Sequence, residues 1–401
     1  IDVWDMGAVQ EADTSKYNNN ITASDWDSCA NVSQAGKFVA GETTFGDLTI
    51  NHIANDRLFS TSSKNYGTNA LATTAYDDGY TAGGMYYCNG TGGETRRNVT
   101  INNVIAGDKI VVYMASSNAA TGTLVFKYLG EDNEQVEKAS FTNKGTKYEF
   151  VAKYSGSYKV YTDAAAGKPI YNRIVRIPGV AVSGTIDGAQ LSGYKVMFKD
   201  EANGITYDAD IKGNTFTATL AAGCNYTAVL SGVAGYGFSN ATKNISTTVD
   251  EALTGKSGVT LSIEEKKVYT YTGKVTGFAA DYDTSNLSVK LVADSSSLAD
   301  DVILKLDSEK AFTATLEPDV KYTVELIGVN DYEVLSGGEI ISQVSYSRDI
   351  EVSARRLYKA AGKFAGLDGN TAVTDVKFTN VDDKYIYCLL YTSDAADDLI
   401  G

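Results

Sequence analysis

The chain has 401 residues, 43% hydrophobic and 21% charged, which is the composition of a globular protein of several domains rather than a disordered or membrane-spanning one. Its formal net charge of −15 argues against nucleic acid and anionic membranes as partners, because phosphate binding requires a basic surface. The single histidine, His52, excludes paired-histidine metal sites and is the one histidine available to a Ser-His-Asp or Cys-His arrangement.

Short segments typical of β-strands run through the first part of the chain. The 38 glycines and 27 tyrosines, against three prolines, favour short strands joined by tight turns. The segments are 46–50, 109–113, 123–127, 148–151, 157–161 and 174–177. Pro178 and Gly179 then mark a boundary. Residues 1–179 are therefore predicted to form one larger β-sandwich.

Aromatic and charged residues gather between positions 57 and 97 of this domain. Aromatic rings stack on sugar rings, and Asp and Arg side chains hydrogen-bond sugar hydroxyls, so a β-sandwich that binds polysaccharide uses this mixture. The candidate ligand-binding residues are Arg57, Tyr76, Asp77, Tyr80, Tyr86, Tyr87 and Arg97. In the alternative interpretation the tyrosines are cross-strand pairs and the arginines are solvated. Asp77 and Asp78 make a poor glycosidase pair, because adjacent strand residues point to opposite faces.

Several single residues have a structural interpretation. Trp4 and Trp26 are predicted to anchor the core or a sheet edge, and His52 to be a hydrogen-bonded strand histidine. Cys29 and Cys88 could pair in an oxidising compartment, but two free thiols are favoured. No CxxC motif is present, so no cysteine metal or redox site is expected.

The second half of the chain contains an internal repeat. A Gly-x-x-x-Gly frame begins at Gly184, Gly273 and Gly362, with a constant spacing of 89 residues. A second block recurs in the same order, at 216–220 and 312–316, with alternating apolar and polar residues typical of half-buried antiparallel strands. Small Ig-like or prealbumin-like β-sandwiches are therefore predicted at 180–267 and 268–356. Cys224 occupies the repeat position of Val320 and is predicted to be a buried, apolar residue.

A third copy of the repeat is expected to start at 357 and to stop near 387. The following segment, 388–401, reads Cys-Leu-Leu-Tyr-Thr-Ser-Asp-Ala-Ala-Asp at its start and resembles the translation of a transposase sequencing adapter. We therefore expect 388–401 to be a read-through artefact, and the natural protein to continue past Tyr387. Without the three aspartates of this tail the net charge would be −12. The first residue is Ile1 rather than Met, which indicates a cleaved leader or a start inside a gene.

The repeats contain two further motifs. The run from Asp281 to Asn286 is similar to a calcium loop but lacks glycine at its sixth position and glutamate at its twelfth, so a solvated turn is expected. Lys274 and Lys363 sit early in their repeats, where Lys–Asn isopeptide crosslinks occur in some surface stalks. Thr185 at the matching position of the first repeat counts against a shared crosslink.

Short motifs throughout 1–387 resemble the accessory region of large secreted bacterial pectin-degrading enzymes, the pectinesterases and pectate lyases. The segment from Trp4 to Ala8 is similar to the family motif Trp-Asp-Phe-Gly-Ala, with Met6 in place of Phe. Further similarity lies in 13–19, 56–61, 76–78, 106–109, 158–161, 173–176, 328–332 and 378–380. The resemblance implies a galactose-binding or carbohydrate-binding-module-like first domain, sandwich spacers, and a catalytic parallel β-helix beyond this chain.

The leading hypothesis is a non-catalytic glycan-binding and spacer region of a secreted, pectin-active enzyme. It implies a monomer at a bacterial surface or outside the cell, a plant cell-wall polysaccharide as partner, and no catalytic residue, metal, cofactor, nucleic acid or membrane partner. Because a polyanion such as unesterified pectin is repelled by the negative charge of the chain, binding favours a neutral or esterified glycan, local arginine contacts, or a bridging cation. The alternatives are a surface adhesin or stalk of tandem sandwiches, and a fragment that is itself a hydrolase or lyase.

Overall fold

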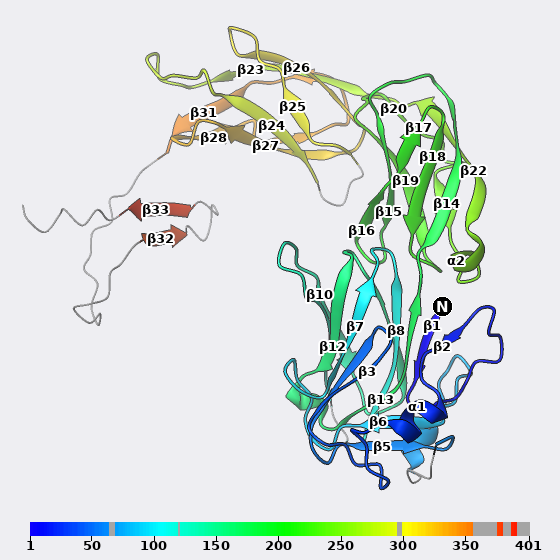
Figure 1. Ribbon diagram of the computed structural model, residues 1–401. Coiled ribbons are helices and arrows are strands. Elements are labelled where there is room, and N and C mark those ends of the chain that lie inside the picture. The colour runs from blue at the N-terminus through cyan, green and yellow to red at the C-terminus, as the bar shows by residue number, and fades with distance from the viewer. Residues whose placement is uncertain (64–68, 119–120, 295–298, 356–374, 380–385, 391–401) are drawn as a thin grey trace, which may run out of the picture. The chain divides into compact units, whose positions relative to one another are not determined.

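The computed structural model describes residues 1–63, 69–118, 121–294 and 299–355, together with the backbone of 375–379 and 386–390. In these residues the regular secondary structure is almost wholly β-strand, and the strands are arranged in facing sheets (Figure 1). The described helices are α1 (Ala23–Ser28), α2 (Glu251–Thr254) and the 3-10 turns η1 (Ala70–Thr73) and η2 (Ala164–Ala166). None of them is long and apolar enough to cross a bilayer. The structure confirms the predicted all-β sandwich class.

Among the described residues, the first sandwich pairs a seven-stranded with a six-stranded sheet. The seven-stranded sheet contains β11 (Thr146–Val151), β8 (Lys109–Ser116), β13 (Pro169–Ile177), β1 (Asp2–Asp5), β2 (Asn18–Asn19), β6 (Gly84–Tyr87) and β5 (Arg57–Ser60). The six-stranded sheet has the order β10 (Val136–Phe141), β9 (Gly122–Tyr128), β12 (Gly156–Thr162), β7 (Asn98–Val104), β4 (Leu48–His52) and β3 (Gly41–Phe45).

An aromatic core joins these two sheets. The ring of Phe126 stacks between those of Phe150 and Tyr158, at centroid distances of 4.8 and 4.6 Å. Trp4 and Trp26 are 1% and 0% exposed. Their indole nitrogens donate to backbone carbonyl oxygens, Trp4 to Phe45 at 2.8 Å and Trp26 to Met6 at 3.0 Å, which satisfies the one polar group of each buried ring. The prediction that both tryptophans anchor the core is confirmed.

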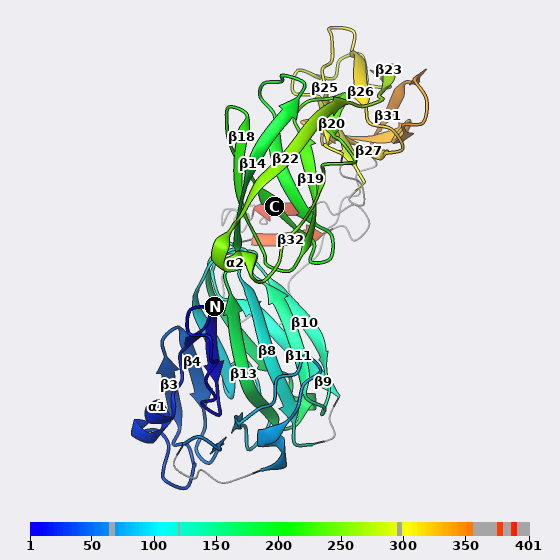
Figure 2. The ribbon, with the colours of Figure 1, turned by 90° about the vertical axis from the view of Figure 1, so that its right-hand side faces the viewer.

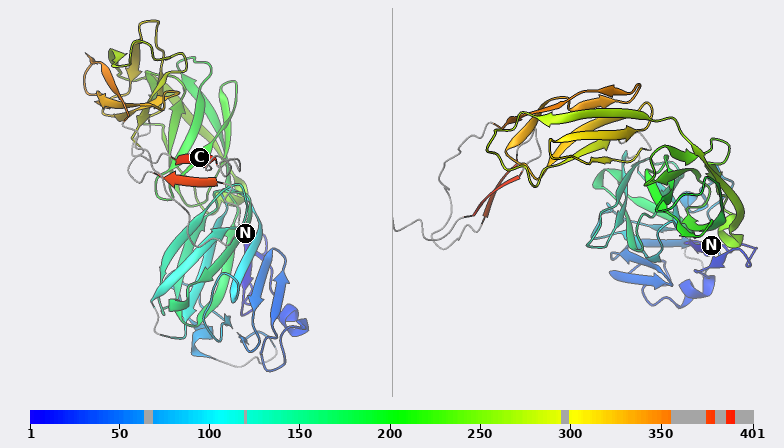
Figure 3. Two further views of the ribbon diagram at one scale, coloured as in Figure 1. Left: turned by 90° about the vertical axis from the view of Figure 1, so that its left-hand side faces the viewer. Right: turned by 90° about the horizontal axis from the view of Figure 1, so that it is seen from above.

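Two smaller sandwiches follow, with matching strand orders. The first comprises β17 (Asp210–Lys212), β18 (Thr215–Leu220), β14 (Val180–Gly188), β22 (Lys256–Glu265) and β20 (Tyr236–Phe238), against β16 (Ile205–Asp208), β15 (Lys195–Asp200), β19 (Asn225–Ser231) and β21 (Asn244–Ser246). The second, yellow to orange in Figure 3, comprises β26 (Ala311–Leu316), β23 (Tyr269–Thr276), β31 (Ile350–Ala354), β28 (Tyr332–Ser336) and β30 (Tyr346–Ser347), against β25 (Val302–Leu304), β24 (Ser288–Ala293), β27 (Lys321–Ile327) and β29 (Glu339–Ile341).

The repeated glycines lie where the first and last strands of each small sandwich run side by side. β14 pairs in parallel with β22, as Figure 2 shows, and β23 pairs in parallel with β31. A Cβ atom at Gly184 would lie 1.9 Å from the carbonyl oxygen of Val259, and one at Gly273 would lie 2.1 Å from that of Arg348. An aromatic residue of the next strand, Phe216 or Phe312, stands directly opposite each glycine. The glycine frame therefore permits a close backbone approach that a side chain would block.

Among the described residues no ladder joins strands from both sides of Pro178–Gly179, where the sequence predicts a domain boundary. The chain divides into two compact units, Ile1–Ser353 and Ala354–Gly401. In the second of these units, β32 (Asp375–Thr379) and β33 (Ile386–Leu390) form an antiparallel pair. The predicted third repeat at 357–387 and the tail at 388–401 otherwise lie outside the described residues.

Candidate functional site

Two of the predicted ligand-binding tyrosines are core residues. Tyr86 is 0% exposed, stacks on Tyr171 at 5.7 Å, and donates its hydroxyl to Asp56 Oδ2 at 3.2 Å. Tyr76 is 6% exposed and donates its hydroxyl to Asn172 Oδ1 at 2.7 Å. Because protein atoms cover both rings, neither ring offers a face on which a sugar could stack, as the alternative interpretation of these tyrosines expects.

Arg97 is likewise held inside the first sandwich. Its Nε donates to Asp56 Oδ1 at 2.8 Å, and the two side chains are 11% and 0% exposed. The carboxylate of Asp56 also accepts backbone N–H groups from Ile53 and Asn89, each at 2.9 Å. The guanidinium of Arg97 therefore neutralises the buried carboxylate of Asp56. Its Nε–H group is already engaged in that ion pair and is not free to bind a ligand.

Tyr80 belongs to a second internal network. Its hydroxyl donates to Asp5 Oδ2 at 2.8 Å, and the guanidinium of Arg173 lies 4.8 Å from the centre of its ring. Burial raises the pKa of the Asp5 carboxyl to about 6, against the opposing effects of the Tyr80 hydrogen bond and the charge of Arg173. The hydroxyl of Tyr80 therefore has a protein partner in Asp5, and the guanidinium of Arg173 lies over the Tyr80 ring while it pairs with Glu11.

The raised pKa of Asp5 predicts a pH-dependent stability of the first sandwich. Since the folded state holds this proton more tightly than the unfolded state, wild-type protein should lose stability relative to Asp5→Asn as pH rises from 4 to 7. From the ordinary value of 3.8 to about 6, the change should approach about 3 kcal/mol. Urea unfolding at several pH values, followed by tryptophan fluorescence, measures it; equal pH slopes for the two proteins would contradict it.

The remaining predicted residues lie on the outer side of the seven-stranded sheet or in a loop. Arg57 and Tyr87 stand directly opposite each other on β5 and β6, and both are half-buried. The ring of Tyr87 packs edge-on against Phe59 at 6.3 Å. Asp77 is exposed. The structure thus brings Arg57 and Tyr87 together, and separates them from the networks of Tyr76, Tyr80, Tyr86 and Arg97.

His52 and the cysteines were predicted to be structural. His52 is 2% exposed, with Nε2 2.8 Å from Thr43 Oγ1 and Nδ1 2.7 Å from the carbonyl oxygen of Val39, so the prediction of a hydrogen-bonded strand histidine is confirmed. Cys29, Cys88 and Cys224 are free thiols. Cys224 is only half-buried, which corrects the prediction of a buried, apolar residue: it lies in the loop before β19 and lines a cleft.

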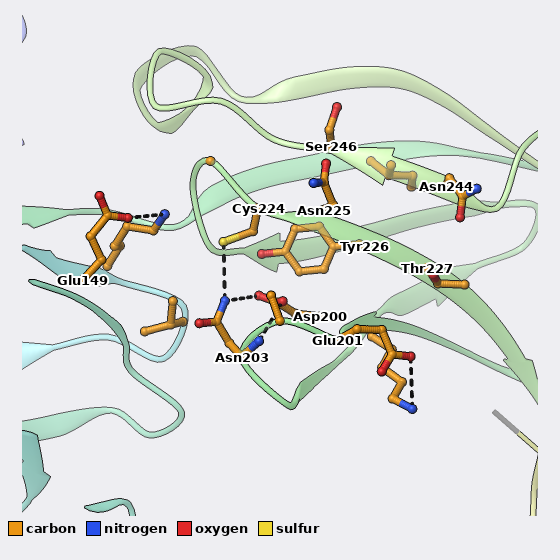
Figure 4. A pocket seen from close by; sticks show the side chains of 16 residues that line it. Glu149, Asp200, Glu201, Asn203, Cys224, Asn225, Tyr226, Thr227, Asn244 and Ser246 are labelled. Atoms are coloured by element: carbon orange, nitrogen blue, oxygen red, sulfur yellow. Dashed lines mark hydrogen bonds and ion pairs between the residues drawn. The ribbon is translucent and has the colours of Figure 1, made fainter. Parts of the chain in front are cut away.

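That cleft, of about 660 Å³, is lined by residues of the first and second sandwiches (Figure 4). Asn203 lies between Asp200 and Cys224, donating its amide to Asp200 Oδ2 at 2.7 Å and lying 3.8 Å from the sulfur. Lys109 Nζ is 3.4 Å from Glu149 Oε2. Tyr226 is 2% exposed, so the cleft offers hydrogen-bonding groups but little of an aromatic face.

A different polar surface lies on the outer face of the six-stranded sheet. Along β7, β9 and β12, alternate residues such as Ile101, Phe126 and Val160 fill the core, so the residues between them face outward. Tyr161 and Lys159 of β12 are half-exposed, and Lys159 stands directly opposite Lys127 of β9. Two residues further along, Val125 of β9 stands between Tyr161 of β12 on one side and Lys138 of β10 on the other.

The Gly93–Arg96 turn reaches onto this face. Glu94 Oε1 lies 2.6 Å from Lys127 Nζ, and Glu94 Oε2 accepts the hydroxyl of Tyr161 at 3.4 Å. Lys159 Nζ donates to the backbone carbonyl oxygen of Glu94 at 3.1 Å. The hydrogen bond from Lys127 lowers the pKa of the Glu94 carboxyl, which keeps it ionised. We call the set Glu94, Lys127, Lys138, Lys159 and Tyr161 the Tyr161 surface.

Sequence reasoning missed this surface. It identified 123–127 and 157–161 as strands, and the alternation within each strand places Lys127, Lys159 and Tyr161 on the face opposite to the buried Phe126, Tyr158 and Val160. What it lacked was the register that sets Lys159 against Lys127. A lysine and a tyrosine two residues apart in an alternating strand are too common a pattern to identify a site.

No protein-family model matches the sequence, and no curated protein sequence matches it either. Among solved structures, the chain is similar to the shaft pilin SpaA from Lactobacillus rhamnosus GG, with 11% identity over 45% of this chain and 100% of that chain, at a TM-score of 0.21. A minor pilin from Streptococcus agalactiae shows 9% identity over 46% of this chain and 100% of that chain, at a TM-score of 0.22. A family two carbohydrate esterase from Cellvibrio japonicus shows 16% identity over 29% of this chain and 35% of that chain, at a TM-score of 0.16.

Proposed function

We propose that the chain is a non-catalytic glycan-binding and spacer region of a secreted or surface-displayed bacterial enzyme that degrades a pectin-like plant cell-wall polysaccharide. The observation that carries the proposal is the Tyr161 surface. It combines a half-exposed tyrosine with lysine and carboxylate groups on one sheet face, which is the mixture that holds a sugar ring and its substituents. The sequence resemblance to pectin-degrading enzymes points to the same class of partner.

The two smaller sandwiches serve as the spacer in this proposal. Only Pro178 and Gly179 separate β13 from β14, and only residues 266–268 separate β22 from β23. Linkers of two or three residues restrict the freedom of one sandwich against the next far more than a long flexible linker does. A binding domain carried in this way is held at a distance from the part of the protein that performs chemistry.

Retention of the full chain on immobilised glycans tests the proposal. Wild-type protein should bind at least one plant cell-wall polysaccharide, and Tyr161→Ala should weaken that binding by about tenfold, because one stacking contact is lost. Tyr194→Ala, which removes a half-buried tyrosine from the second sandwich, is the matched control and should bind as wild type. Absence of binding to every glycan tried would sink the proposal.

A surface stalk or adhesin is the second candidate, favoured by the same short linkers and tandem sandwiches. The isopeptide crosslink considered for it gains no support at Lys274: its ammonium lies 2.6 Å from Glu309 Oε2, and the two side chains are 47% and 73% exposed. Lys363 lies outside the described residues. Intact mass would show the loss of ammonia if a crosslink formed, and a stalk without glycan retention would replace the leading proposal.

A further inference from the structure

The third sandwich, which runs from β23 to β31, has an edge strand with one unpaired side. This strand is β26: its neighbour on one side is β23, and among the described residues no strand pairs with its other side. Its counterpart in the second sandwich is β18. Phe216 of β18 stands opposite Gly184, and Phe312 of β26 stands opposite Gly273 in the same way. The corresponding side of β18 is covered by β17 (Figure 1). The described part of the third sandwich therefore leaves open an edge that the second sandwich closes.

The unpaired side of β26 presents the backbone groups of Thr313 and Thr315. The carbonyl oxygen of Lys310 accepts a hydrogen bond from β23 at 3.0 Å, so Lys310 directs its backbone groups toward β23. This direction alternates along an antiparallel strand, so Ala311, Thr313 and Thr315 direct theirs away from β23. Ala311 is already bonded, because its N–H donates to Asp307 Oδ1 at 2.8 Å and its carbonyl oxygen accepts the Asp307 N–H at 3.0 Å. The two threonines, whose side chains are exposed, form the open edge.

β26 carries none of the features by which proteins protect an exposed sheet edge. Such edges are usually very short, charged, bulged or interrupted by proline. β26 has six residues, Ala311–Leu316, with neither charge nor proline among them and no break in its register against β23. Other edge strands of this sandwich differ: β25 and β29 have three residues each, and β28 carries the exposed Glu333. The edge at β26 is therefore suited to pairing with another strand.

We propose that β26 pairs with β26 of a second copy of the chain, antiparallel about a two-fold axis at Ala314, in place of the monomer that the leading hypothesis expects. Thr313 of one copy then stands opposite Thr315 of the other, and a pair of this kind exchanges two backbone hydrogen bonds. The facing threonine side chains add a favourable cross-strand contact. Because β26 holds no charged residue, no like charges oppose each other along the pair. The strand is thus complementary to itself.

The contact between the two copies is small, because the turn at Asp307 closes the open edge at Ala311. Self-association should therefore be weak and should depend on protein concentration. The net charge of −15 repels two copies and salt screens this repulsion, so association should strengthen as salt rises. A dimer carries two first sandwiches, and two linked binding domains hold a polymeric ligand more firmly than one.

Sedimentation velocity of the full chain over about a hundredfold range of protein concentration measures the association. Wild-type protein should shift from monomer toward dimer as its concentration rises. Thr313→Glu/Thr315→Glu brings like charges face to face and should lower the association constant by about tenfold or more, as should Thr313→Lys/Thr315→Lys. An equimolar mixture of these two double variants should associate again, because glutamate then faces lysine.

The matched control is Thr215→Glu/Thr217→Lys, on the edge of β18 that β17 covers. Each new charge faces a residue of opposite charge in β17, and this variant should associate as wild type. Circular dichroism establishes that each variant is folded.

Three results would overturn the pairing of β26 with itself. The first is wild-type protein that stays monomeric at every concentration. The second is dimerisation that persists unchanged in both charged double variants, which places the contact elsewhere. The third is a mixture of the two folded variants that stays monomeric. Glycan retention is a separate measurement, so a failure of the proposed function leaves each of these results unchanged.

Discussion

Replacing Gly184 by alanine should lower the free energy of unfolding of the second sandwich by about 2–4 kcal/mol, an effect of the size found for overpacked cores. The added Cβ would meet the carbonyl oxygen of Val259 at 1.9 Å and the ring of Phe216 at 2.8 Å. The oxygen belongs to the backbone of β22, so it moves only if the parallel pairing of β14 and β22 opens. Hydrogen exchange of peptides covering these two strands measures the effect.

The same substitution in the next sandwich supplies an internal replicate. At Gly273 the added Cβ would lie 2.1 Å from the carbonyl oxygen of Arg348 and 2.9 Å from the ring of Phe312, so a comparable loss is expected. Gly93→Ala is the matched control, because nothing lies within 4 Å of its added Cβ. If the backbone amides of β14 and β22 exchanged as slowly in Gly184→Ala as in wild type, the result would contradict the close approach of these two strands.

The repeat illustrates how far sequence reasoning reaches. The constant spacing and the alternation of Phe216 to Leu220 predict strands with one buried face, and β18 has Phe216 and Leu220 buried as expected. The purpose of the glycines could not be predicted. It depends on β22, a strand that begins about 70 residues after Gly184 and whose parallel position beside β14 leaves no local signal in the sequence.

In the candidate site, the sequence does not determine which side chains face the core. Adjacent residues of a strand face opposite sides, so the pair Tyr86 and Tyr87 must place one ring inside the sandwich and one outside. The sequence does not say which, and the structure buries Tyr86 while leaving Tyr87 half-exposed. The composition of the sequence identifies a region rich in tyrosine and arginine. Whether each of these side chains is buried or exposed depends on partners far along the chain, such as Asp56 for Arg97.

Replacing Arg97 by alanine should therefore destabilise the first sandwich by about 3–5 kcal/mol, the cost of leaving a buried carboxylate without its cation. Asp56 is 0% exposed, and its remaining donors are the backbone N–H groups of Ile53 and Asn89 and the hydroxyl of Tyr86. These neutral groups cannot replace the charge of the guanidinium. Both tryptophans of the chain lie in this sandwich, so their fluorescence during urea unfolding reports its stability.

Arg96→Ala is the control for this experiment, since Arg96 is exposed and donates to Thr91 Oγ1 at 3.3 Å; it should change stability by less than about 0.5 kcal/mol. The comparison of the two variants shows whether Arg97 stabilises the fold or contacts the ligand. A variant of Arg97 that unfolds early loses ligand binding because its domain is lost, so such a loss says nothing about contact with sugar. If Arg97→Ala instead kept the stability of wild type while losing glycan binding, Arg97 would belong to the ligand site after all, and its ion pair with Asp56 would open when the glycan binds.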